Sequence, residues 1–523
     1  MKAKRFRRKI AAGIALAMMF SLAACGKNDD KEAATTATQT TEITTVVTED
    51  TELTDTTAAL GEDAELTDAA GDDTDVTADD TKDNTEDITA ETGISIVPDK
   101  DDMEINETIT NDTDGGHAIL ADAETAEYSN IKVEKTGEAD GDEADFYGEN
   151  ATIFATNGAT LSLSEIVVNS DGKHANGVFS YGEGTTVNIS DSVIETSGNC
   201  SGGLMTTGGG TMNATNLYIH TTGNSSAAIR SDRGGGTVTV TGGEYITDGT
   251  GSPAIYSTAD ITVNDALLTS TSSQGVVVEG KNSVTLNDVT LTADNNSKNS
   301  DKSSYYQAVM IYQSMSGDAA EGDAAFTMNG GMLVNKNGDI FFVNNTVADI
   351  NLTDAEIVNE DAEGVFLRAA AAGWGSEGSN GGKVNLYASD QVIDGDILVD
   401  SVSKLNLYLS DGSDFEGAVN PDGAEGEVYV EISGGSVWKL AADSYITSLT
   451  CDVDSIDLNG HTLYVNGTAY TEGTASAGEK LTLSSGGSGG SGNGQNAGPG
   501  GEKPDGNGGP GGDGSEPPAK PED

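Results

Sequence analysis

The chain repeats itself from Leu161 onward, where short apolar–polar–apolar runs recur at nearly constant spacing. The runs open at Leu161, Val187, Met212, Val238, Ile261 and Val284, in steps of 26, 25, 26, 23 and 23 residues. The pattern continues through Phe326, Ile350, Val384 and Leu405, with longer steps where loops are inserted. A fixed period of roughly 20–50 residues is typical of repeat proteins, in which each unit buries its apolar face on its neighbours.

Each repeat contains three short runs that suit β-strands. In residues 185–210 these runs are TVNIS, SVIETS and GLMTT, each rich in β-branched residues and bounded by Asp, Asn, Ser or Gly. The next unit aligns beneath, with Val187 over Met212 and Leu204 over Ile229. Such a unit is too short for a βαβ crossover or a four-stranded propeller blade. Three strands and three turns per unit predict one rung of a parallel β-helix.

With this pattern the chain resembles the right-handed parallel β-helix proteins of the pectin-lyase-like superfamily, and most of all their surface-exposed, adhesin-type members. The resemblance spans roughly residues 131–470 and rests on the repeat pattern, so it concerns fold more than function. It implies an all-β, right-handed solenoid of about 10–12 rungs. We expect this solenoid, with a cap at each end, over residues 94–483.

Residues 1–24 have the form of a lipoprotein signal peptide. A basic segment over residues 2–9 precedes an apolar run over 10–20 that is too short to be a good membrane span. Leu-Ala-Ala-Cys at 22–25 then matches the bacterial lipoprotein cleavage pattern, which predicts that Cys25 carries a lipid. An ordinary secretory signal with an incidental cysteine is the alternative. We expect a mature chain outside the cytoplasm, lipid-anchored to the bacterial membrane and surface-exposed.

Two flanking segments differ in composition from the repeats. Residues 25–93 are rich in Thr, Asp, Glu and Ala, and residues 484–523 in Gly, Ser, Pro and Asn. Neither can bury enough apolar surface to fold, so we expect a disordered acidic tether and a disordered tail. The chain carries 86 Asp and Glu against 26 Lys and Arg, a net charge of −60, which argues against nucleic acid and anionic polymers as direct ligands.

Catalytic signatures of the superfamily are faint in this chain. Residues 112–115 (Asp-Thr-Asp-Gly) and 460–462 (Gly-His-Thr) resemble fragments of polygalacturonase motifs, but they lie at opposite ends of the sequence. The histidines are scattered, and we expect none to have a partner at the spacing of a triad or a metal site; they are His117, His174, His220 and His461. A polysaccharide lyase or hydrolase acting through the inserted loops is one alternative function, and a structural stalk is another.

One predicted row of side chains points to binding. Because side chains alternate along a strand, the residue after the inward aliphatic of each third strand should point outward. That row reads Phe154, Phe179, Met205, Arg230, Tyr256, Val277 and Met310, with Phe341 and Phe366 as its expected continuation. A contiguous apolar stripe usually marks an interface, and its rings could stack on sugars. Alternatively, the N-terminal segment or inserted loops cover the stripe, or the register is shifted by one residue.

We therefore expect a carbohydrate-binding or other adhesin-like face, without catalytic residues, at Phe179, Arg230, Arg233, Tyr256, Tyr312, Arg368 and Trp374. Trp374 lies in the Gly-rich insert 369–382, which should emerge along the same edge as the insert 313–325. A Ca²⁺ loop is a further hypothesis at Asp140, Asp142, Glu143 and Asp145. A solvated acidic turn is the alternative for these four residues.

Overall fold

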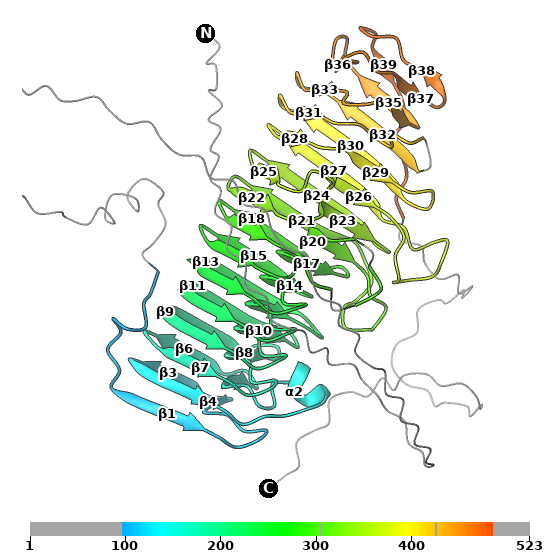
Figure 1. Ribbon diagram of the computed structural model, residues 1–523. Helices are drawn as coiled ribbons and strands as arrows, with labels where there is room; N and C mark the ends of the chain where they lie inside the picture. Colours follow the sequence, from blue (N-terminus) through cyan, green and yellow to red (C-terminus); the bar gives the residue numbers. More distant parts are fainter. Residues whose placement is uncertain (1–96, 299, 304, 424–425, 485–523) are drawn as a thin grey trace, which may run out of the picture. The chain divides into compact units, whose positions relative to one another are not determined.

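The computed structural model describes residues 97–484 except 299, 304 and 424–425, and these residues form a parallel β-helix (Figure 1). The predicted signal peptide, Cys25, the acidic tether and the tail from residue 485 onward lie outside the described residues. Within the described part, no helix is long and apolar enough to cross a membrane.

One rung shows how the repeat forms the coil. β6 (Thr160–Ser164), β7 (Val167–Ser170) and β8 (Val178–Tyr181) follow one another around it. β6 and β7 both pair in parallel with β9 (Thr186–Thr196), and β8 pairs in parallel with β10 (Leu204–Thr207). The predicted three strands per rung are confirmed.

The third strands of the rungs build an 11-stranded parallel sheet, which agrees with the predicted number of rungs. This sheet, called sheet B here, carries the candidate sites. Its strands are β2 (Ile119–Asp122), β5 (Ile153–Thr156), β8, β10, β12 (Ile229–Ser231), β14 (Ile255–Ser257), β17 (Val276–Glu279), β20 (Gln307–Tyr312), β23 (Asp339–Asn344), β26 (Leu367–Ala369) and β29 (Ile397–Val399).

The first and second strands of the rungs build a 21-stranded sheet that winds around the other sides of the coil. Besides β6, β7 and β9 it contains β1 (Glu107–Asn111), β3 (Thr125–Ser129), β4 (Ile131–Lys135), β11 (Gly210–Thr221), β13 (Gly236–Thr247), β15 (Asp260–Asn264), β16 (Leu267–Ser270), β18 (Ser283–Asn287), β19 (Thr290–Ala293), β21 (Ala324–Asn329), β22 (Met332–Asn335), β24 (Val347–Thr353), β25 (Glu356–Asn359), β27 (Lys383–Ser389), β30 (Lys404–Ser410), β32 (Glu427–Ile432), β35 (Ser448–Cys451) and β39 (Ser476–Ala477).

The last rungs add two small sheets and leave the parallel pattern. The strands are β28 (Val392–Asp394), β31 (Asp414–Glu416), β33 (Val437–Lys439) and β36 (Ile456–Asp457) in one sheet, and β34 (Ser444–Ile446), β37 (Leu463–Val465) and β38 (Thr468–Ala469) in the other. β39 pairs antiparallel with β35, and β38 with β37. These antiparallel pairs cover part of the final strand edge, which would otherwise invite pairing with another chain.

The inside of the coil is filled by the repeated apolar positions. Val187 pairs with Met212 and Leu204 with Ile229, as predicted, and all four are at most 1% exposed within one continuous core. Burying each such side chain stabilises the fold by roughly 1.5–3 kcal/mol. One predicted step is wrong by two residues, because Leu386 and not Val384 pairs with Ile350. β24 buries an additional inward residue, Ala348, and that residue is the partner of Val384.

Left-handed turn residues stack from rung to rung and fix the positions of side chains outside the coil. Asp191 and Asn216 have φ values of 48° and 50°, and the Asn216 amide donates a 2.8 Å hydrogen bond to Asp191 Oδ1. Asn and Asp tolerate this backbone conformation better than most residues. In the turn before the third strand, His174, Cys200 and Ser225 all have φ of 55°. Successive rungs therefore place these three side chains in equivalent positions.

Candidate functional site

The outward row on sheet B exists as predicted through seven rungs. Strand register pairs, in order, Phe154, Phe179, Met205, Arg230, Tyr256, Val277 and Met310. Beyond Met310 the prediction is wrong, because Phe341 and Phe366 are 0% and 1% exposed in the core. Phe342 and Arg368 continue the row. β23 carries two adjacent phenylalanines, so residue type alone could not decide which of them faces outward.

The segment between β4 and β5, which contains a short helix, lies over the first half of this row and packs on it through Ala151. α2 (Asp142–Phe146) lies in the segment between β4 and β5 (Figure 1). Thr207 Oγ1 of β10 donates a 2.7 Å hydrogen bond to the carbonyl oxygen of Phe146. Phe179 and Met205 are 0% exposed in an apolar cluster outside the coil. Phe179, expected in a ligand-binding face, therefore has no side-chain surface open to solvent.

Two arginines from the turn after β12 and from β12 itself hold α2 in place. Arg230 Nη2 lies 3.1 Å from Asp145 Oδ1 and 2.9 Å from Asp232 Oδ2. Arg233 Nη1 lies 2.8 Å from Asp142 Oδ2. Burial raises the pKa of Asp232 above its usual range, although the neighbouring Arg230 opposes the rise. Two of the three arginines of the predicted binding face are thus engaged in ion pairs with the protein itself.

The four acidic residues of the hypothesised Ca²⁺ loop have separate surroundings. Asp140 pairs with Lys173, while Asp142 and Asp145 pair with the two arginines. Glu143 is exposed in the first turn of α2. Among the described residues these four do not form a cluster of metal-ligating groups.

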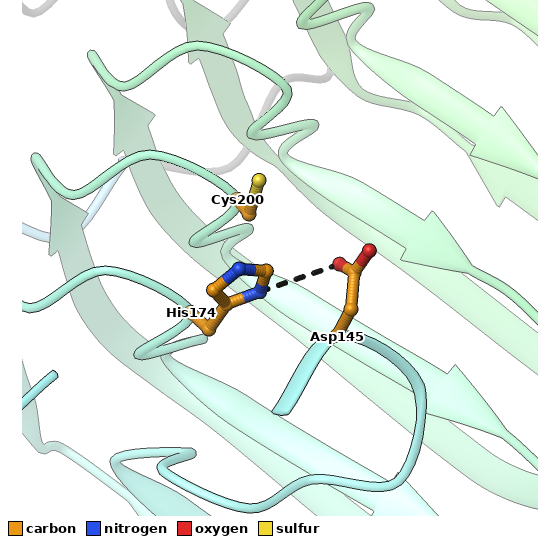
Figure 2. A group of neighbouring side chains, drawn as sticks. All are labelled: Asp145, His174 and Cys200. Atoms are coloured by element: carbon orange, nitrogen blue, oxygen red, sulfur yellow. Dashed lines mark ion pairs between the residues drawn. The ribbon is translucent and has the colours of Figure 1, made fainter. Parts of the chain in front are cut away.

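A different set of metal-ligating side chains meets beside α2. Asp145, His174 and Cys200 bring a carboxylate oxygen, an imidazole nitrogen and a sulfur within 4.8 Å of one another (Figure 2). His174 Nδ1 lies 3.5 Å from Asp145 Oδ1, and the imidazole is 8% exposed. Burial raises the pKa of the Cys200 thiol, and the Asp145 carboxylate adds to the rise. For Asp145 burial acts in the same direction, but Arg230 and His174 lower the pKa to about 2.

The expectation that no histidine has a metal-ligand partner is wrong for His174. His174 and Cys200 are 26 residues apart, which is the length of one rung, as between Leu161 and Val187. That spacing is readable in the sequence and could have predicted the pair. Asp145 could not be placed in the same way, because α2 lies outside the repeat.

The second half of the outward row lies beneath two inserted loops. Trp374, in the loop after β26, meets Tyr312 edge-on with ring centres 5.0 Å apart. Tyr305 lies at the end of the loop between β19 and β20, and its ring centre is 5.4 Å from the ring centre of Phe342. Tyr256 packs against the same apolar cluster. Three predicted binding residues, Tyr256, Tyr312 and Trp374, are therefore brought together on one side of sheet B.

A cavity of about 90 Å³ opens among these rings. Tyr256, Tyr305, Tyr312 and Trp374 line it together with the amide side chain of Gln307. Gln307 is 1% exposed, and neither its Nε2 nor its Oε1 has a hydrogen-bond partner among the described residues. We call the surface formed by these five residues the loop face. Gln307 was not predicted, because nothing in the sequence distinguishes it from a structural glutamine.

A buried carboxylate supports two rings of the loop face from behind. The hydroxyls of Tyr256 and Tyr312 donate hydrogen bonds of 2.5 and 3.0 Å to Glu279 Oε2. Glu279 is 1% exposed. Burial raises the pKa of both tyrosines well above the usual range, so they stay protonated donors.

Arg368, the last predicted binding residue, lines a neighbouring cavity of about 240 Å³ that shares Tyr305 with the first. Its guanidinium lies 4.2 Å from the centre of the Tyr305 ring, and Arg368 Nε lies 2.6 Å from Asp339 Oδ2. The seven predicted residues therefore divide into two groups. Tyr256, Tyr312, Arg368 and Trp374 gather around Tyr305, while Phe179, Arg230 and Arg233 lie at α2.

A larger hollow of about 490 Å³ lies over the turns that follow the second strands. Glu134, Asn169, Glu195 and His220 are among its lining residues, which include no Phe, Tyr or Trp. Its polar walls are open to solvent and lack the rings that distinguish the loop face.

The fold by itself implies no function, because one architecture serves many unrelated activities. Only the geometry of individual sites can therefore carry a functional argument. Comparisons of the chain with models of protein families, with curated proteins and with solved structures gave no match in any of the three.

Proposed function

We propose that this protein is a surface-displayed bacterial lipoprotein whose β-helix binds carbohydrate at the loop face without transforming it. Four aromatic rings and one buried amide line a single cavity there. Sugars present apolar C–H faces surrounded by hydroxyl groups. Aromatic rings pack against the C–H faces, and a few well-placed polar groups form hydrogen bonds with the hydroxyl groups.

The observation that carries this proposal is that the buried amide of Gln307 has no hydrogen-bond partner among the described residues. A buried polar group without a hydrogen bond costs roughly 1–3 kcal/mol, so its presence asks for a reason. Both amide atoms of Gln307 are in that state among the described residues, and the side chain lines the aromatic cavity. A sugar hydroxyl both donates and accepts hydrogen bonds, so carbohydrate could satisfy either atom.

The alternative of a polysaccharide hydrolase requires two carboxyl groups roughly 5–10 Å apart across the sugar. The described residues that line the cavity of the loop face include no Asp or Glu. Glu279, just behind the cavity, accepts hydrogen bonds from the hydroxyls of Tyr256 and Tyr312 at Oε2, while its Oε1 is buried without a partner among the described residues. The chemistry of this lining favours binding over hydrolysis.

A glycan array probed with the full chain, with Ca²⁺ and with a chelator, tests the proposal. We expect specific binding that Trp374→Ala weakens about fivefold, since a ring contact is worth about 1 kcal/mol. Tyr387→Ala is the matched control, because Tyr387 is 38% exposed on β27 of the other sheet and stacks on Tyr408 at 4.8 Å. An array without binding, or an equal loss in both variants, would contradict the loop face. Release of a cleaved product would favour the enzyme.

The lipid anchor rests on the cleavage pattern that ends at Cys25. We expect labelled palmitate to enter the intact chain expressed in a bacterium and to be absent from Cys25→Ser. Cys200→Ser is the control and should keep the label, because Cys200 lies in the β-helix. Label retained by Cys25→Ser would refute this part of the proposal.

A further inference from the structure

We propose that Asp145, His174 and Cys200 form a binding site for a transition-metal dication of the zinc class. The site lies beside α2, involves none of the loop-face residues, and does not depend on the carbohydrate proposal.

The donor set selects the kind of metal. Zn²⁺ is borderline soft and takes thiolate, imidazole and carboxylate at about 2.0–2.3 Å, whereas Ca²⁺ and Mg²⁺ prefer oxygen alone. Ligand atoms around such an ion are roughly 3–4 Å apart, by the tetrahedral geometry of these bonds. The three donor atoms here already lie within 4.8 Å of one another. Small side-chain rotations would therefore close the site around an ion.

The buried imidazole is the independent observation that points to a ligand. His174 is 6% exposed, and its Nδ1 has no hydrogen-bond partner among the described residues. The same nitrogen faces Asp145 Oδ1 at 3.5 Å, an ion-pair distance that is longer than the roughly 2.7–3.2 Å of an ordinary N–H···O hydrogen bond (Figure 2). A cation at the lone pair of Nδ1 would remove the cost of leaving that nitrogen unsatisfied.

The fold holds two of the ligands on rigid backbone. The amide N–H of His174 donates to Asn199 O at 3.0 Å, and that of Cys200 to Asn224 O at 2.8 Å, so each turn is bonded to the next rung. Asp145 is brought in by α2 and oriented by Arg230. Ligands on a regular scaffold need little reorganisation to bind a metal.

The local charge balance suits a dication. With the thiol deprotonated, Cys200, Asp145 and Asp232 carry three negative charges, and Arg230 carries one positive charge between the two carboxylates. The sum, three negative and one positive, is −2, which a divalent ion neutralises. Arg230 therefore lowers the negative charge of the group without reversing it.

Three protein ligands leave one coordination position of a tetrahedral ion open. That arrangement is typical of zinc sites that bind a water molecule or an external ligand, whereas structural sites supply four ligands. The Asp145 side chain is 25% exposed, and Cys200 is also partly exposed, so solvent can reach the group. The structure thus assigns this ion a fourth ligand from solution, either water or a small Lewis base.

Co²⁺ titration of the full chain tests the site, because cobalt bound to a thiolate gives an intense near-ultraviolet charge-transfer band. We expect one Co²⁺ per chain with this band, and competition by Zn²⁺. Cys200→Ser should abolish the band, and His174→Asn should weaken binding by at least about 100-fold, since even the loss of an outer-shell partner costs roughly 10–100-fold in metal affinity. Cys451→Ser is the matched control, since Cys451 is the other free thiol of the described chain and is buried in β35.

No thiolate band in the unchanged chain, or a band that persists in Cys200→Ser, would overturn the proposal. A second measurement avoids substitutions, in case a variant fails to fold. Zn²⁺ should slow the alkylation of Cys200 at least tenfold, read by peptide mass spectrometry, while the rate at Cys451 stays unchanged. Binding should also strengthen as pH rises, because the metal must displace the thiol proton. An alkylation rate that ignores Zn²⁺ would equally refute the site.

Discussion

A substitution of Gln307 should weaken carbohydrate binding without lowering the stability of the fold. Both amide atoms of Gln307 are unsatisfied among the described residues, so Gln307→Leu removes a polar burial cost without removing a side-chain hydrogen bond. Its backbone carbonyl still accepts from Asn295 Nδ2 at 3.0 Å after the substitution. We expect the free energy of unfolding to stay the same or rise by about 1 kcal/mol, while carbohydrate affinity falls about tenfold. Urea denaturation and titration calorimetry measure the two effects.

Asn344→Leu is the control, because it replaces a buried amide whose nitrogen, unlike that of Gln307, is hydrogen-bonded. Asn344 Nδ2 donates to the carbonyl oxygens of Ala370 and Asn380 at 2.9 and 2.8 Å. Losing two such bonds should lower the free energy of unfolding by about 1–3 kcal/mol. If Gln307→Leu proves as destabilising as Asn344→Leu, the Gln307 amide is structural and the argument from its unsatisfied atoms fails.

Elements inside the repeat were predictable, and elements outside it were not. Each rung repeats the same alternation, so the outward row was placed correctly from Phe154 to Met310. The register of the row was wrong only at Phe341 and Phe366, where two apolar residues stand side by side and the alternation is ambiguous. α2 follows no such pattern. It has five residues and no side-chain cap, and a helix so short is not stable alone. Contacts with Arg230 and Arg233 hold it, and these contacts could not be known before the fold was.

The segments that cover the outward row could not be predicted for the same reason, because they lie outside the repeat. An apolar stripe predicts that something packs on it, but not whether the partner is another molecule or a segment of the same chain. Here the segment that links α2 to β5 packs on Phe179 through Ala151, and the loop carrying Trp374 packs against Tyr312. The sequence therefore predicted the apolar stripe on sheet B but not the segments that cover it. Which side chains stay accessible beside it depends on loops whose conformations do not repeat.

In a β-helix each rung contacts mainly the rungs next to it. A column of glycines marks a turn where the backbones of successive rungs lie especially close together. Gly198, Gly223 and Gly249 hold one turn position in successive rungs. A Cβ placed on Gly223 would lie 1.9 Å from the carbonyl oxygen of Gly198. Gly223→Ala must therefore push one rung away from the next, at a cost of about 1–3 kcal/mol. We expect faster amide hydrogen exchange in β9, β11 and β13 and unchanged exchange in β30, since solenoid rungs contact only their neighbours.

Thr222→Ala is the control for this substitution, because Thr222 is exposed beside the glycine and its loss should change stability by no more than about 0.5 kcal/mol. Exchange that rises equally in β11 and β30 would mean that the whole coil opens as one unit. The core is continuous from Ile119 to Leu463 and is the feature that would transmit such an opening from rung to rung. The measurement therefore decides whether the proposed metal site near α2 and the loop face can open independently. The two sites lie in different rungs of the same β-helix. A ligand bound at one site leaves the stability of the other unchanged only if each rung is coupled to its nearest neighbours alone.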